Sequence, residues 1–243
     1  MPAAVPAARI VQLTDTHLSP RLGVPAQWPA LLDWLSADPP DLVVHTGDIV
    51  YEDPDDEADR TFARGLLNEV PAPLLAIPGN HDIGFFGEDV ERPRRLAAFV
   101  ATWGQDRFVV DLGGWRVVGA DTYLLGTPDH DAWLAASVSG PQPVVLFLHQ
   151  PLVGEPVDGW EMPAPARAAA ERALAGADVR VVASGHRHLA RTGNGAVWAP
   201  SLTLTGDDWG DGSDPRPGLV EHRLHSDGNH EHRVVRPWTD SVR

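Results

Sequence analysis

The sequence predicts an α/β protein whose central strands run largely parallel. Short, almost wholly apolar runs alternate along the chain with amphipathic segments of helical length. Apolar runs of four or five residues are typical of strands buried on both faces, and their alternation with helices is typical of parallel sheets. The predicted strands are Ile10–Thr14, Leu42–Thr46, Leu74–Ile77, Val117–Ala120, Val144–Leu148 and Val179–Ala183.

The segments between these strands carry helical periodicity. Phe62, Leu66 and Val70 repeat at four-residue spacing behind the acidic residues 55–57, which favour a helix N-terminus. Two further apolar faces predict helices, the second ended by Gly176: Leu96, Phe99, Val100 and Trp103, and Ala166–Leu174.

The last part of the chain, from about residue 197, is β-rich. Residues 221–224 and 231–234 flank an Asp227-Gly228 turn, which predicts a β-hairpin. A surface zinc site is conceivable on this hairpin, but a solvated hairpin explains the segment unaided; the histidines concerned are His222, His225, His230 and His232. No repeat or linker interrupts the chain, so residues 1–243 are predicted to form a single domain.

Composition excludes several kinds of chemistry. The chain has 243 residues without cysteine, and all 19 basic residues are arginine, which excludes disulfides, thiolate sites and lysine Schiff bases. A formal net charge of -15 disfavours nucleic-acid polymers and anionic lipid as partners. No apolar run reaches the roughly 18 residues of a membrane span, and no secretory signal is evident, so we expect a cytoplasmic protein.

Polar motifs follow five of the predicted strands, each at the strand's carboxyl end. In open α/β sheets the loops at that edge build the binding site. The motifs are Asp15-Thr16-His17, Gly47-Asp48, Gly79-Asn80-His81-Asp82, His149 and Gly185-His186-Arg187-His188.

These loops together offer a mixed nitrogen and oxygen donor set without sulfur. Each motif alone is compatible with a turn or a core histidine, but five of them after buried strands favour metal binding. Such donors suit Mn, Fe or Zn rather than Ca, and the number of donors fits two ions that share a bridging carboxylate. The candidate donors are Asp15, His17, Asp48, Asn80, His81, His149, His186 and His188.

In this order, from residue 9 to about residue 205, the motifs resemble those of the calcineurin-like metallophosphoesterase superfamily. The resemblance implies a four-layer αββα sandwich of two mixed β-sheets flanked by helices. It also implies two metal ions per chain, bridged by Asp48. One ion is assigned to Asp15, His17, Asp48 and His188, and the other to Asp48, Asn80, His149 and His186.

The same resemblance implies catalytic roles for His81 and Asp82. His81 is not a ligand in the family; it lies by the leaving group, and Asp82 is expected to orient it. A hydroxide that bridges the two ions would attack the phosphorus atom, and His81 would protonate or stabilise the departing alkoxide.

Within the superfamily, the opening residues 11–18 and Ala199-Pro200-Ser201 are most similar to the class III cyclic-nucleotide phosphodiesterases. Gln150 stands where many of those enzymes carry a second histidine. Tyr51 matches a metal-binding tyrosine of purple acid phosphatases, but those enzymes replace the residue at His17, so we interpret Tyr51 as packing beside the centre. Arg187 is placed either to touch the phosphate or to point away.

The predicted function is hydrolysis of phosphodiesters of small soluble molecules, cyclic nucleotides among the candidates. The alternatives are a phosphomonoesterase of the same fold and a non-catalytic metal-binding interaction scaffold. The expected partner is a small-molecule phosphate ester, without a nucleic-acid polymer or a membrane; a homodimer stays open.

Overall fold

The computed structural model describes residues 7–51, 53–87, 89–154 and 160–238, which form two β-sheets. The first sheet has the order β11-β10-β1-β2-β3. Its strands are β1 Ala8–Leu13, β2 Leu42–His45, β3 Leu74–Ala76, β10 Leu219–Leu224 and β11 His230–Val235. The second sheet has the order β4-β5-β6-β7-β9-β8. Its strands are β4 Phe108–Leu112, β5 Trp115–Gly119, β6 Val144–Phe147, β7 Val179–Ser184, β8 Arg191–Gly193 and β9 Ala196–Trp198.

Both sheets are mixed, with parallel centres and antiparallel edges. Strands β1, β2 and β3 are parallel, and so are β5, β6, β7 and β9. The antiparallel pairs are β1 with β10, β10 with β11, β4 with β5, and β8 with β9. The parallel strands present their carboxyl ends at one edge of each sheet, which is where the polar motifs begin.

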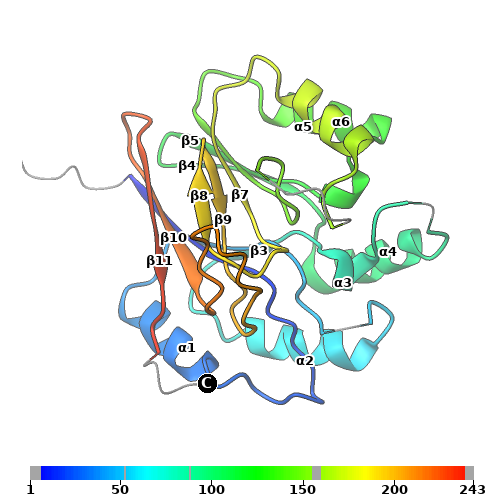
Figure 1. The fold of residues 1–243 in the computed structure, drawn as a ribbon, viewed down its shortest axis with the longest axis vertical. Coiled ribbons are helices and arrows are strands. Elements are labelled where there is room, and N and C mark those ends of the chain that lie inside the picture. The colour runs from blue at the N-terminus through cyan, green and yellow to red at the C-terminus, as the bar shows by residue number, and fades with distance from the viewer. Residues whose placement is uncertain (1–6, 52, 88, 155–159, 239–243) are drawn as a thin grey trace, which may run out of the picture.

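Helices cover the outer face of each sheet (Figure 1). Helices α1 Trp28–Ala37, α2 Glu57–Leu67 and α4 Arg92–Trp103 share an apolar cluster with the first sheet. Helices α5 Pro128–Ser137 and α6 Ala164–Leu174 share another with the second sheet. A third cluster fills the space between the sheets, where Ile10 and Val44 lie with Val117, Val145 and Phe147. The predicted αββα sandwich is therefore confirmed.

The six predicted strands and three predicted helices are present, with ends shifted by up to a few residues. The edge strand β4 and helices α1 and α5 were not predicted as elements. Strand β4 alternates buried and exposed residues, which is a weaker signal than an unbroken apolar run. Trp28, Trp34, Trp103 and Trp133 pack from helices onto the sheets.

The C-terminal hairpin is also confirmed, and one of its histidines extends into the core. Strands β10 and β11 pair around the turn at Gly228. His222 is fully buried and bonds to His230 at 3.0 Å on one side and to Gln12 Oε1 at 3.1 Å on the other. Gln12 in turn donates to Thr46 Oγ1 and to the Ser184 carbonyl. This polar chain links the hairpin to strands of both sheets.

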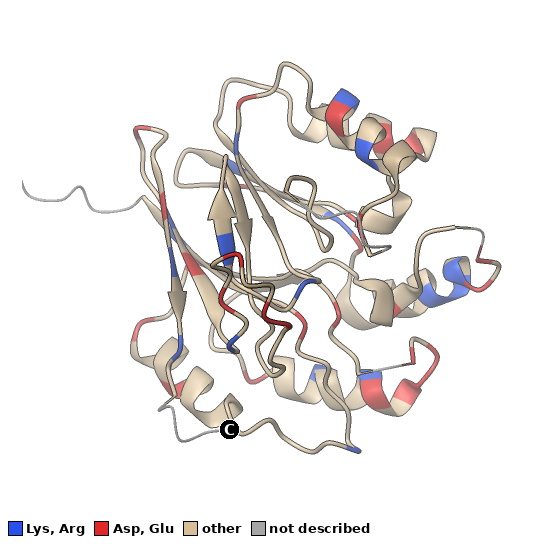
Figure 2. Ribbon diagram, in the orientation of Figure 1, with Lys and Arg blue, Asp and Glu red and all other residues tan. Residues whose placement is uncertain are grey.

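Arginines are interspersed with acidic residues over the helices and loops (Figure 2). Arg94 and Arg95 both pair with Asp55, and Arg216 and Arg236 both pair with Asp214. Paired arginines offer little net positive charge to a polyanion. Among the helices in the described ranges, none has the length and apolar character needed to cross a membrane.

Candidate metal centre

The five polar motifs meet at the seam between the two sheets. The loops after β1 and β2, and the short helix α3 Asn80–Ile83 after β3, approach from the first sheet. The loops after β6 and β7 approach from the second. All seven predicted ligands lie there, together with His81.

The first group of donors consists of Asp15, His17, Asp48 and His188, whose donor atoms all lie within 4.8 Å of one another. His17 Nε2 and His188 Nε2 are 3.1 Å apart, and His188 Nε2 is 3.3 Å from Asp15 Oδ1. Three of the four side chains come from the first sheet and His188 comes from the second. The grouping has the same members as the set that the family resemblance assigns to one ion.

The second group consists of Asp48, His149 and His186, which satisfy the same 4.8 Å limit. His149 Nε2 lies 3.2 Å from His186 Nδ1 and 3.1 Å from Asn80 Oδ1. Asn80 therefore faces the same space. This arrangement matches the set assigned to the second ion.

Asp48 stands between the two groups. Its Oδ1 is 3.5 Å from His149 Nε2 in the second group, and its Oδ2 is 4.0 Å from His17 Nε2 in the first. The backbone N–H of His81 donates to Oδ1 at 2.8 Å and fixes the carboxylate plane. The two oxygens thus face different groups, as a bridging carboxylate requires.

The ligand loops hold their backbone in an uncommon conformation. Six non-glycine residues in the described ranges have positive φ, and five of them are Asp15, His17, Asp48, His186 and His188, with φ from 45° to 69°. The left-handed region is disfavoured for residues with a Cβ, and such residues cluster at functional sites. The residues with this backbone conformation are the candidate ligands themselves, two in the loop after β1, one after β2 and two after β7.

Hydrogen bonds to main-chain carbonyls orient the imidazoles. Nδ1 of His17 donates to the Tyr51 carbonyl at 3.2 Å, and Nδ1 of His149 donates to the Thr46 carbonyl at 2.8 Å, which leaves Nε2 of each ring facing the centre. His186 is reversed: its Nε2 donates to the Trp160 carbonyl at 3.2 Å, so Nδ1 faces the centre.

The donor set fits metal ions. Asp15 Oδ2 accepts hydrogen bonds from Thr14 Oγ1 and from the His186 backbone, whereas the buried Oδ1 accepts none from the part of the chain that the structure describes and faces His188. A buried carboxylate oxygen without a donor is costly unless a cation satisfies it. Imidazole nitrogens that converge with carboxylate oxygens suit divalent transition metals.

The carboxylates and imidazoles of the centre shift one another's pKa values. Burial alone would raise the pKa of the Asp15 and Asp48 carboxyls, but His188 and His149 beside them hold both values below the ordinary one. Although burial lowers the pKa of His149, Asp48 raises it to about 9. Burial, and then His149, lower the pKa of His186 to about 3. The ionised carboxylates thus draw a positive charge into the seam.

His81 lies at the edge of the centre, but Asp82 does not hold it. His81 Nε2 is 4.0 Å from Asp48 Oδ2, and its ring stands edge-on to His17 with centroids 4.7 Å apart. The Asp82 carboxylate instead accepts backbone N–H groups of Gly79, Ile49 and Val50. His81 Nδ1 has no hydrogen-bond partner within the described ranges. The expectation that Asp82 orients His81 is therefore corrected: Asp82 ties together the two loops that carry Asp48 and Asn80.

Residues to which the sequence assigned no role at the centre support the candidate ligands. Tyr123 donates its hydroxyl to Asn80 Oδ1 at 2.9 Å, and the Thr122 hydroxyl accepts from the His149 backbone. Ser201 and Thr203 donate to the carbonyls of Asp15 and Thr16. Isolated hydroxyls carry no sequence signal of such contacts, because the contacts join distant segments.

Tyr51 and Gln150 contact ligands in ways that the sequence left open. The Tyr51 carbonyl accepts from His17, and its ring centroid lies 6.5 Å from that of His17. Gln150 Nε2 donates to the Trp160 carbonyl at 2.7 Å and lies 3.1 Å from His186 Nε2. Gln150 thus helps to hold the carbonyl that sets the orientation of His186.

We expect Gly79→Ala to destabilise the protein and distort the metal centre. A Cβ at Gly79 would lie 2.2 Å from Asp48 Oδ1 and 2.3 Å from the Asp48 backbone nitrogen, so main chain would have to move. The expected loss in the free energy of unfolding is roughly 1–3 kcal/mol, with lower metal content. Urea denaturation and metal analysis measure both.

The matched control is Gly65→Ala, in the exposed part of α2, where a Cβ meets nothing within 4 Å. Because alanine favours helix over glycine, this variant should be more stable by up to about 1 kcal/mol. A Gly79→Ala protein as stable and as metal-rich as wild type would contradict the close approach of the two loops.

We expect Asp121→Asn to remove a pH dependence of stability. Asp121 is fully buried, and its Oδ1 accepts from the Tyr123 backbone. Burial raises the pKa of this carboxyl to about 8. The folded chain therefore keeps a proton that the unfolded chain releases above about pH 4, so this group's stabilisation is lost as the pH rises from about 4 to about 8.

In the Asp121→Asn variant the side-chain oxygen can still accept the hydrogen bond from the Tyr123 backbone, but the side chain no longer titrates. The stability of this variant relative to wild type should rise by about 1 kcal/mol or more between pH 5 and pH 8. Thermal or urea unfolding of both proteins at the two pH values measures the difference. A constant difference across this range would contradict the neutral carboxyl.

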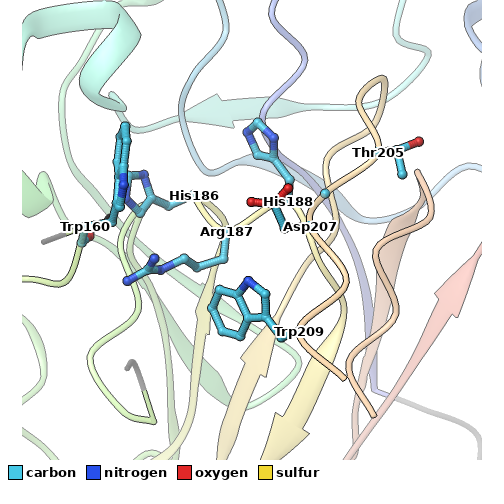
Figure 3. A pocket seen from close by; sticks show the side chains of 8 residues that line it. Trp160, His186, Arg187, His188, Thr205, Asp207 and Trp209 are labelled. Carbon is cyan, nitrogen blue, oxygen red and sulfur yellow. Dashed lines mark hydrogen bonds between the residues drawn. The ribbon is translucent and has the colours of Figure 1, made fainter. Parts of the chain in front are cut away.

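Two hollows open beside the centre. One of about 370 Å³ lies against His186 and His188 and is also lined by Trp160, Arg187, Thr205, Gly206, Asp207 and Trp209 (Figure 3). The other, of about 390 Å³, is lined by Asn80 and His81 with Pro54, Gly84, Phe85, Phe86, Asp89 and Arg95. Phe85 and Trp160, one from each hollow, are in edge contact with ring centroids 6.2 Å apart.

Known proteins resemble this chain in sequence and in fold. The chain is 30% identical over 133 residues to the serine/threonine-protein phosphatase CPPED1 of Bos taurus, covering 48% of this chain and 41% of that protein. It is 35% identical over 121 residues to the glycerophosphodiester phosphodiesterase GpdQ of Enterobacter lignolyticus (strain SCF1), covering 46% and 42%. The matched segments span less than half of either relative.

A solved dimetal phosphatase from Danio rerio shares the fold, with a TM-score of 0.65 and 14% identity over 96% of this chain and 97% of that one. The calcineurin-like phosphoesterase family model matches residues 8–190, a span that contains every proposed ligand. With the two donor groups at the seam of an αββα sandwich, the chain belongs to the calcineurin-like phosphoesterase family.

Proposed function

We propose that this protein is a two-metal phosphodiesterase that hydrolyses small-molecule diesters. The observation that carries the proposal is the pair of hollows beside the centre, one lined by His186 and His188 and the other by Asn80 and His81. A phosphodiester has two substituents on one phosphate group, whereas a monoester has a single one. A phosphate held at the seam would place one substituent in each hollow.

The proposed ligands are Asp15, His17, Asp48 and His188 for one ion, and Asp48, Asn80, His149 and His186 for the other. The donor set suits Mn, Fe or Zn. Two ions bound there supply Lewis acidity, which activates water and neutralises phosphate oxygens. The protein side chains fix where this chemistry acts.

His81 is the proposed proton donor to the leaving group. Its Nε2 is on the centre side of the ring, 4.0 Å from Asp48 Oδ2, and the side chain lines the Asn80 hollow. A substituent in that hollow would depart beside His81, which would give a proton to its oxygen. His17 holds the ring edge-on in place of Asp82. The other substituent, in the His186 hollow, would stay on the phosphate.

The names of the two sequence relatives indicate different classes of substrate. One is named a glycerophosphodiester phosphodiesterase and the other a serine/threonine-protein phosphatase. A phosphomonoesterase is therefore the rival function. The second hollow favours the diester, because a monoester would leave it without a substituent.

Two substrates that release the same leaving group, 4-nitrophenolate, test the proposal. Methyl 4-nitrophenyl phosphate is a diester and 4-nitrophenyl phosphate is the matching monoester. With Mn²⁺ we expect kcat/KM for the diester to be at least about 10-fold higher, a difference of about 1.4 kcal/mol in transition-state binding. The Asp48→Asn protein, purified in parallel, controls for contaminating phosphatases. Preference for the monoester would overturn the proposal.

A further inference from the structure

The hollow beside His81 has aromatic walls. Phe85 and Phe86, which follow α3 in the chain, line it together with Pro54. Phe85 is 53% exposed, and its ring is in edge contact with that of Trp160, with the centroids 6.2 Å apart. Placing an apolar group against an exposed ring is favourable, because it removes both surfaces from water. The hollow therefore offers a bound group an aromatic surface that the fold itself leaves partly uncovered.

The inner part of this wall is tied to the donor groups. Phe86 is half-buried, packs against the apolar clusters outside both sheets and has its ring centroid 4.8 Å from that of Tyr123. Tyr123 is buried and donates its hydroxyl to Asn80 Oδ1 at 2.9 Å. Asn80 is a proposed ligand, and it lines the hollow together with His81. A ring held against Phe86 would therefore lie close to the proposed proton donor.

The charged side chains that line the same hollow are paired. Arg95 donates from Nη1 to Asp89 Oδ2 at 3.0 Å, and from Nε and Nη2 to Asp55 at 3.1 and 2.8 Å. The other oxygen of Asp89 accepts the backbone N–H of Glu91 at 3.0 Å. A charged leaving group would have to compete with these charge-assisted bonds, whereas an uncharged group leaves them intact. The lining therefore favours an uncharged occupant.

We propose that this hollow is the subsite for the leaving group, and that it selects an uncharged group with a flat apolar face, such as benzyl. Phe85 is the specificity-determining residue. The volume of about 390 Å³ falls in the usual range of small-molecule sites, roughly 300–1,000 Å³, so an aromatic ring has room there. The inference rests on the proposed phosphodiesterase function, and it adds the chemical class of the leaving group.

Benzyl methyl phosphate tests the inference, because either of its two ester bonds can break. In both cases an oxygen from water forms the new bond to phosphorus and the departing alkoxide takes up a proton. Benzyl alcohol and methanol are almost equally acidic, so their intrinsic reactivity gives little preference. With Mn²⁺ we expect the protein to release benzyl alcohol over methanol by about 10-fold or more, as burial of a phenyl group provides. Proton NMR of the two alcohols measures this ratio within one reaction.

Variants connect the preference to the subsite. Phe85→Ser should lower the ratio of benzyl alcohol to methanol by about 3- to 10-fold, the contribution of one aromatic contact, whereas Phe85→Tyr keeps the ring and should keep the ratio. Val90→Ser is the matched control, because Val90 is 90% exposed in the same stretch of chain and is not part of the lining. Both alcohols come from one substrate, so partial loss of metal lowers the rate without changing the ratio.

Each outcome decides the inference. Equal or preferred release of methanol would overturn the subsite, and preferred release would place the ring in the other hollow, beside Trp160 and Trp209 (Figure 3). Equal ratios for Phe85→Ser and Val90→Ser would also overturn it, and so would cleavage of methyl 4-nitrophenyl phosphate without cleavage of the benzyl ester. These results leave the phosphodiesterase proposal standing. Failure of the metal-loaded protein to cleave either ester would overturn the proposed function, and the subsite with it.

Discussion

Asp48→Asn should strongly reduce both the activity and the metal content of the protein. The two carboxylate oxygens of Asp48 face different donor groups. Replacing the carboxylate with a neutral amide therefore removes a negatively charged ligand from both proposed metal sites at once. Activity on a 4-nitrophenyl diester should fall by roughly 1,000-fold or more, since losing a single oxyanion-stabilising group typically costs about 100- to 1,000-fold. Metal per chain should drop below wild type.

Elemental analysis of the purified protein, together with kcat/KM at saturating Mn²⁺, measures both effects. Asp129→Asn is the matched control: it removes one carboxylate from the exposed start of α5, away from the centre, and should keep metal and activity. Full metal content in the Asp48→Asn protein would contradict a bridging role.

His81→Ala should lose activity while it keeps its metal. His81 is placed outside the two donor groups, and a general acid contributes about 100- to 10,000-fold. The loss should depend on the leaving group, because an alkoxide needs a proton and a nitrophenolate needs one far less. We therefore expect a fall of about 100-fold or more with an alkyl diester and a clearly smaller fall with a 4-nitrophenyl diester.

Parallel assays of the two diester types, with metal analysis, measure this difference. His232→Ala, an exposed substitution on β11, is the control for removing an imidazole. Equal losses with both leaving groups would point to stabilisation of the phosphate rather than proton transfer, and loss of metal would make His81 a ligand.

The sequence predicted that the candidate donors lie close together because each follows an apolar strand, and parallel strands bring their carboxyl ends together. The pairing of strands into two sheets came from the family resemblance, since apolar runs do not reveal their neighbours. The left-handed backbone at His186 and His188 was beyond prediction, because residues with a Cβ seldom adopt it.

The predicted role of Asp82 was wrong because of the geometry of the short helix that carries it. His81 and Asp82 are adjacent on α3, and consecutive side chains on a helix point in different directions. Asp82 turns back to the loop amides while His81 faces the hollow. Tyr123 was missed because its contact with Asn80 joins positions 43 residues apart.

Each donor group contains residues from both sheets, so metal binding would affect the stability of the fold as well as catalysis. His17 and His188 stand 171 positions apart in the chain, and a metal ion shared by them would be a cross-link between the two layers. Closing so long a loop costs the unfolded chain much entropy, and an ion bound to the folded state alone shifts the equilibrium towards it. Without cysteine the chain cannot form a disulfide, so coordination is the cross-link open to it. Loss of the ions and loosening of the sandwich should therefore occur as one event.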